Sequence, residues 1–117
     1  MKNIQKNIHD LTKEFINNVV VSQDIEDVGG HQTIFRFGYY GVSVIEHEEP
    51  EDKSRPFTMA TLLFFYRNTD IQCQFYPEST LIPKGFRKNA SYQEVKDVLL
   101  KASKLNNSQL EVQLGGY

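Results

Sequence analysis

The chain has 117 residues, of which 39% are hydrophobic and 12% aromatic, and this predicts a single domain, residues 1–117, with one core. A lone cysteine, Cys73, excludes an internal disulfide, and no stretch approaches ~18 consecutive apolar residues, the length that a membrane-spanning helix needs. The polar N-terminus lacks the apolar stretch of a signal peptide, so we expect a cytoplasmic protein.

The net charge of −2 hides an uneven distribution. Residues 24–52 contain eight acidic residues and one basic residue, whereas residues 84–104 contain six basic and two acidic residues. Such asymmetry marks either an interaction surface or a solvated face.

The first predicted element is an amphipathic helix over residues 3–18. Its apolar stripe has spacings of three and four, as helix periodicity requires, and consists of Ile4, Ile8, Leu11, Phe15 and Val19. The β-branched residues 19–21 favour extended chain, and the polar, acidic stretch that follows, closing with Gly29 and Gly30, predicts a loop.

The stretch FRFGYYGVSVI, residues 35–45, has the composition of a strand but contains two glycines. Glycines at 38 and 41 permit the positive φ of a tight reversal, and an unbroken strand here would be unusually long. We therefore predict a hairpin with strands 32–37 and 41–47. Residues 46–55, with five carboxylates near Pro50, predict an extended and solvated loop.

Residues 57–67 form the most informative stretch, because both faces of a strand here are apolar. Such a strand lies inside a sheet and requires protein over both surfaces. If both helices of the chain pack on one face, the other stays apolar and a homodimer follows.

A fourth strand is predicted at 71–76, with Ile71, Cys73 and Phe75 directed inward. Residues 77–90 contain two prolines and a glycine and are predicted to be irregular. Within them, Leu81, Ile82 and Phe86 are expected to hold the loop onto the core.

Residues 91–105 predict the second helix. Ser91 and Glu94 form a capping box, and Lys101 and Lys104 favour the C-terminal end. The alternation in residues 110–114 suggests a short C-terminal edge strand. The predicted fold class is α+β: an N-terminal helix, a four-stranded antiparallel meander and a C-terminal helix.

Four stretches together resemble a group of small uncharacterised phage proteins: FRFGYYGVSVI, FTMATLLFF, QFYPESTLIPKGF and YQEVKDVLLK. The resemblance covers about residues 33–105. It implies a phage or prophage origin, a bacterial cytoplasm, and an accessory protein that acts on host machinery. It supplies no catalytic residue.

The residues favour no catalytic, cofactor or metal site. On one face of the predicted strand Cys73 lies between Ile71 and Phe75, which predicts a small hydrophobic residue rather than a nucleophile. His47 with its neighbouring glutamates lacks the spacing of a metal motif. Neither Gly29 with Gly30 nor Gly38 with Gly41 is accompanied by the lysine and the following helix that a phosphate-binding loop requires. We predict a protein that is not an enzyme.

Three functional hypotheses remain. The first is an accessory protein that binds a host or defence protein through Tyr39, Tyr40, Glu46, Glu48, Glu49, Glu51, Asp52 and Tyr76. The second is a nucleic-acid-binding module that uses Lys84, Arg87, Lys88, Tyr92 and Lys96. The third is a small structural or assembly factor of a virion.

Overall fold

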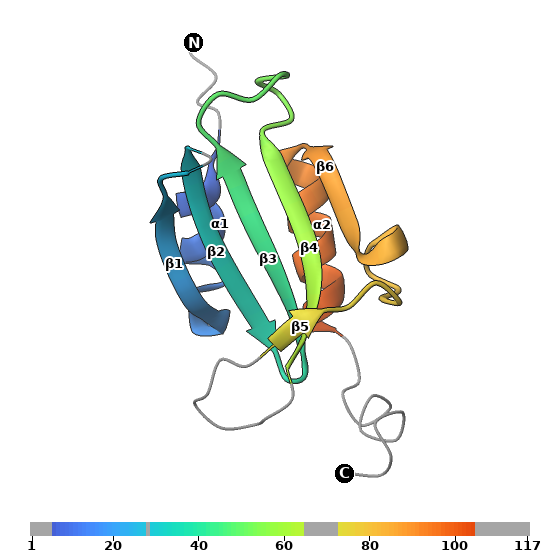
Figure 1. The fold of residues 1–117 in the computed structure, drawn as a ribbon. Coiled ribbons are helices and arrows are strands. Elements are labelled where there is room, and N and C mark those ends of the chain that lie inside the picture. Colours follow the sequence, from blue (N-terminus) through green and yellow to red (C-terminus); the bar gives the residue numbers. More distant parts are fainter. Residues whose placement is uncertain (1–5, 28, 65–72, 105–117) are drawn as a thin grey trace, which may run out of the picture.

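The computed structural model describes residues 6–27, 29–64 and 73–104, and it confirms an α+β fold in which one helix precedes and one helix follows the strands of an antiparallel sheet (Figure 1). In chain order the elements are α1 (Ile8–Glu14), the 3-10 helix η1 (Ile16–Asn18), β1 (Val19–Ile25), β2 (Gly30–Phe37), β3 (Tyr40–His47), β4 (Phe57–Phe64), β5 (Cys73–Phe75), the 3-10 helix η2 (Pro83–Gly85), β6 (Phe86–Ala90) and α2 (Tyr92–Ser103).

The N-terminal helix is shorter than the 3–18 predicted. Asn7 caps it, because its side chain accepts the His9 amide at 2.9 Å while the Asp10 carboxylate accepts the Asn7 amide at 2.8 Å. Phe15 leaves helical geometry and a 3-10 turn follows, so the helical spacing predicted beyond residue 14 is wrong. Residues 3–5 lie outside the described residues.

The hairpin prediction is confirmed, since β2 and β3 pair in register from Gly30–His47 to Phe37–Tyr40. Gly38 has a φ of 70°, which supplies the left-handed geometry of a two-residue reversal. The strands follow the order β1-β2-β3-β4-β5, and β6 also pairs with β4.

Two strands were missed. The polar residues 22–25, predicted as loop, continue β1 at the edge of the sheet, and residues 86–90, predicted as irregular, form β6. Edge strands contact protein on one side only, so they carry polar residues without the alternation that reveals an inner strand. The acidic loop after β1 is therefore reduced to residues 26–29.

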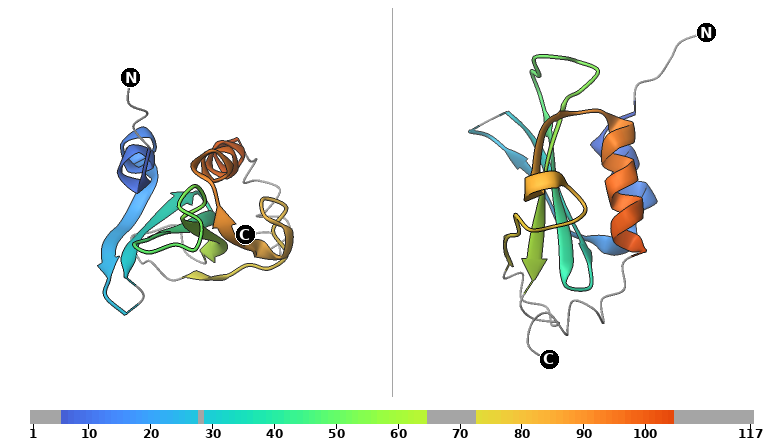
Figure 2. Two further views of the ribbon diagram at one scale, coloured as in Figure 1. Left: turned by 90° about the horizontal axis from the view of Figure 1, so that it is seen from above. Right: turned by 90° about the vertical axis from the view of Figure 1, so that its right-hand side faces the viewer.

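Both helices pack on the same face of the sheet (Figure 2). The core between the helices and the sheet is aromatic and aliphatic, and α2 contributes Val95, Val98, Leu99 and Ala102 to it. Its fully buried members include Ile8, Leu11, Phe35, Val42, Val44, Phe57, Met59, Val95 and Leu99. The capping box of α2 is confirmed, with the Glu94 amide donating to Ser91 Oγ at 3.2 Å.

The interior position of β4 is confirmed, because β3 lies on one side of it and β5 and β6 on the other. The helices cover only one of its two faces. The described part of strand 71–76 is β5, and its predicted direction is wrong: Phe75 pairs with Leu62 on the face away from the helices and is 47% exposed.

Leu81 and Ile82 are buried as predicted, whereas Phe86 is 44% exposed. None of the described helices is long and apolar enough to cross a membrane. Residues 65–67 of the predicted third strand, residues 71–72 of the fourth, residue 105 and the suggested strand at 110–114 lie outside the described residues.

Candidate protein-binding surfaces

The two acidic stretches of the sequence meet at one end of the sheet, which we call the acidic end: residues 24–27 and 46–52. The loops after β1 and β3 lie at this end (Figure 1), where the Glu48 amide donates to the Gly29 carbonyl at 2.8 Å. An open hollow of about 680 Å³ lies between them. Its lining includes Asp24, Glu26, Glu46 and Glu48 together with His31 and His47.

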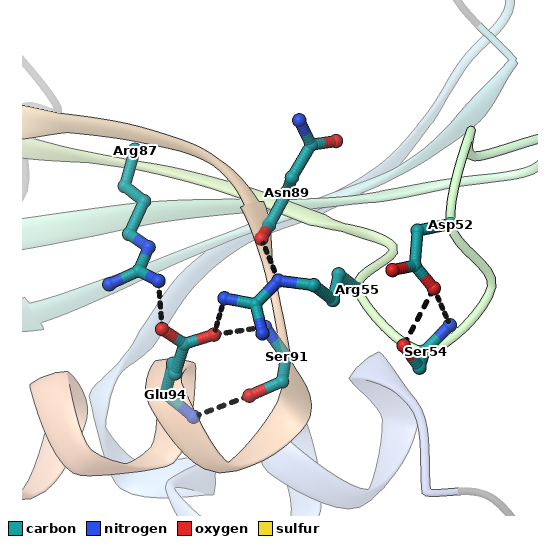
Figure 3. A network of polar contacts seen from close by, with 7 residues as sticks. All are labelled: Asp52, Ser54, Arg55, Arg87, Asn89, Ser91 and Glu94. Atoms are coloured by element: carbon teal, nitrogen blue, oxygen red, sulfur yellow. Dashed lines mark hydrogen bonds and ion pairs between the residues drawn. The ribbon is translucent and has the colours of Figure 1, made fainter.

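The loop between β3 and β4 is anchored rather than extended freely into solvent as predicted. The Ser54 hydroxyl and amide both donate to Asp52 and hold the pKa of that carboxyl below its usual value. Arg55 then reaches across to β6 and α2, where its Nε donates to the Asn89 carbonyl at 2.7 Å and its guanidinium pairs with Glu94 (Figure 3). Arg87 pairs with the same carboxylate.

Most predicted acidic interface residues stay accessible at this end. Glu48, Glu49, Glu51 and Asp52 are exposed. Glu46 is half-buried, and its carboxylate accepts the Ile8 amide at the start of α1 at 3.2 Å. Four carboxylates therefore point outward from a loop whose backbone is held on both sides.

The predicted tyrosines do not join this surface. Tyr39, expected to be exposed, is only 7% exposed. It lies in the turn between β2 and β3 and packs with Leu63 of β4. Tyr40 and Tyr76 are half-buried with ring centroids 5.8 Å apart, and burial, followed by the neighbouring Tyr76, raises the pKa of Tyr40. The tyrosines and the acidic loop lie at opposite ends of β3.

The predicted basic residues are dispersed. Arg87 is paired with Glu94, and Lys96 with Glu14 at 3.2 Å. Lys88 lies over the Phe86 ring on β6, whereas the half-buried Tyr92 is the first residue of α2. Lys84 lies apart in η2. The structure therefore does not gather these five side chains into one patch.

A hydrogen-bonded chain on the β1 edge was not predicted. Ser22 Oγ lies 2.8 Å from His31 Nε2, and His31 Nδ1 lies 2.8 Å from Asp24 Oδ1. The order of atoms matches a hydrolase triad, but the Asp24 side chain is 87% exposed, whereas a triad aspartate is buried. We interpret these two hydrogen bonds as a link between β1 and β2 rather than as a catalytic triad. Its signal, Ser-x-Asp opposite a histidine, is visible only once residues 22–25 are known to be a strand.

Cys73 is half-buried, and burial raises the pKa of its thiol against the opposing effect of Arg36. A nucleophilic thiol needs the opposite shift. Among the described residues, no group of three or more His, Cys, Asp or Glu side chains is arranged to hold a metal ion.

The second surface is the sheet face away from the helices, which we call the open face. Its central row crosses five strands through directly opposed residues, and directly opposed residues project to the same side. That row is Val21, Ile34, Ser43, Ala60 and Phe86. The flanking rows are Gln23, Gln32, Ile45 and Thr58 on one side and Arg36, Gly41, Leu62 and Phe75 on the other.

The polar groups of the open face bond to one another. Gln23 Nε2 donates to Gln32 Oε1 at 2.9 Å, and Gln32 Nε2 donates to Ser43 Oγ at 2.9 Å. Thr58 Oγ1 lies 2.7 Å from His47 Nε2. Arg36 donates to the Gly38 carbonyl at 2.8 Å and lies over the Phe64 ring, 4.5 Å from its centroid. Covering this face would therefore leave few polar groups without partners.

Comparison of the chain with protein-family models, with curated proteins and with solved structures gave no match.

Proposed function

We propose that the protein is a non-enzymatic binding protein whose acidic end contacts a basic surface on a protein partner. The observation that carries this proposal is the meeting of residues 24–27 and 46–52 at one end of the sheet, with Glu48, Glu49 and Glu51 directed into solvent. Clustered charge of one sign raises the association rate with a surface of opposite sign.

The anchoring of the loop supports binding rather than simple solvation. Arg55 fixes the end of the loop to β6 and α2, and the Glu48 amide fixes its start to Gly29. A loop held in place loses less conformational entropy when a partner binds. The resemblance to phage proteins suggests that the partner is a protein of the bacterial host, such as a defence factor, met in the cytoplasm.

Nucleic acid is a weaker candidate ligand. Arg87 and Lys96 already form ion pairs within the fold, and the exposed carboxylates of the acidic end repel phosphate.

The test is affinity capture from a bacterial lysate, followed by binding measurements with the captured protein once it is purified. The variant Glu49→Lys/Glu51→Lys reverses charge at the acidic end, and Glu78→Lys/Asp97→Lys makes the same change in net charge at exposed positions elsewhere. We expect the first variant to weaken binding by ~10-fold or more and the second to leave it unchanged.

Binding should also weaken between about 0.1 and 1 M salt, as the Debye length falls from about 10 to 3 Å. Equal binding by wild type and both variants would exclude the acidic end as the contact surface.

A further inference from the structure

We propose that the open face is covered by a second copy of this chain, related to the first by a two-fold axis that passes near Ser43. This inference is independent of the proposed function, because the acidic end lies outside the face that would be buried. The five strands of the central row place β3 in the middle, and Ser43 lies at the middle of β3.

The composition of the face favours burial. Its three rows hold Val21, Ile34, Ile45, Ala60 and Leu62. They end at Phe75 and Phe86, the two most exposed phenylalanines among the described residues. Removing apolar area from water stabilises a complex. An exposed apolar surface of a few hundred Å² often marks an interaction site.

The area is sufficient for a dimer. The five strands are spaced ~4.8 Å apart, and the longest of them rise ~3.3 Å for each of eight residues, so the face spans at most about 24 by 26 Å, or roughly 600 Å² per copy. Two copies would bury about 1,200 Å², the lower limit for specific, stable interfaces.

The face also suits itself as a partner. In a two-fold interface the same patch of each copy contacts its equivalent in the other copy. Clustered charges of one sign would therefore repel each other, and hydrogen-bond donors without acceptors on the same patch would stay unpaired. The three rows contain one charged residue, Arg36, and no carboxylate. Their amides and hydroxyls are already paired within the sheet through Gln23, Gln32 and Ser43.

A cross-link tests the geometry directly. A two-fold axis that lies between the two sheets, parallel to them and near Ser43, places residue 43 opposite its mate, with the sheets ~10 Å apart. We expect Ser43→Cys in a Cys73→Ser background to give a covalent dimer with a bifunctional thiol reagent that spans ~10 Å, a separation longer than a disulfide bridges. The control is Leu100→Cys in the same background, since Leu100 is exposed on α2 and should not cross-link.

The mass of the unmodified protein gives the second readout. Light scattering at about 100 μM is expected to show twice 13.6 kDa for the wild type and for Leu100→Lys, and 13.6 kDa for Ser43→Lys. If Ser43→Lys loses its circular dichroism signal, Phe86→Lys replaces it, because Phe86 is largely solvent-exposed in the single chain. A monomeric wild type with no cross-link through residue 43 would overturn the inference.

Discussion

Thr33 and Thr61 are two threonines in equivalent surroundings with different hydrogen bonding. Both are fully buried on the helix side of the sheet, one on β2 and one on β4. The Thr61 hydroxyl donates to the Tyr76 carbonyl at 2.8 Å, whereas the Thr33 hydroxyl has no partner within the described part of the chain. A buried hydroxyl without a partner costs ~1–3 kcal/mol.

The same substitution should therefore have opposite effects at the two sites. We expect Thr33→Val to raise the free energy of unfolding by about 1 kcal/mol, and Thr61→Val to lower it by about 1–2 kcal/mol because the Tyr76 carbonyl loses its donor. Urea denaturation followed by circular dichroism measures both. A Thr33→Val variant as unstable as Thr61→Val would mean that the Thr33 hydroxyl is hydrogen-bonded in solution.

At the scale of elements, Glu94 joins the start of α2 to two other segments. Its carboxylate accepts the Ser91 amide at 2.9 Å. It also pairs with Arg55 from the loop between β3 and β4 and with Arg87 from β6 (Figure 3). Burial opposes ionisation of this carboxyl, but the Ser91 hydrogen bonds and the two guanidinium groups together hold its pKa below the ordinary value of 4.5.

We expect Glu94→Gln to lower the free energy of unfolding at neutral pH by about 1–2 kcal/mol. A lowered folded-state pKa means that the stabilisation is present above the unfolded-state pKa and is lost as pH falls through the folded-state value. The difference between wild type and variant should thus shrink below pH ~4.5. Asp97→Asn, which removes an exposed carboxylate on the same helix, is the control. A difference that stays constant down to pH ~3 would contradict the assigned role.

The elements that sequence predicted well are those whose signal is local. The capping box of α2 and the glycine at the β2–β3 turn each identify their element directly. The edge strands β1 and β6 carry no such signal, because most of their exposed residues are polar and β1 contains a bulge near Val20. Phe86 was placed in the core by residue type alone, and only the pairing of β6 with β4 shows that it faces solvent.

At the scale of the whole molecule, sequence identified β4 as apolar on both faces but could not show which face the helices cover. The face that the helices cover depends on the connections α1–β1 and β6–α2, both of which place their helix on the same side of the sheet (Figure 2). The acidic end has the same origin. Residues 24–27 and 46–52 are adjacent only because the β1–β2 and β3–β4 connections lie at the same end of an antiparallel sheet.

A dimer through the open face makes the stability of the fold depend on concentration. Ligands or partners that bind only the folded state raise its melting temperature by mass action, and a second copy does the same. For a dimer of this size, each tenfold increase in protein concentration should raise the melting temperature by ~3 °C. Differential scanning fluorimetry from about 1 to 100 μM measures this, and Ser43→Lys should show no dependence. A wild-type melting temperature that does not change across this range would argue that the open face stays uncovered by a second copy.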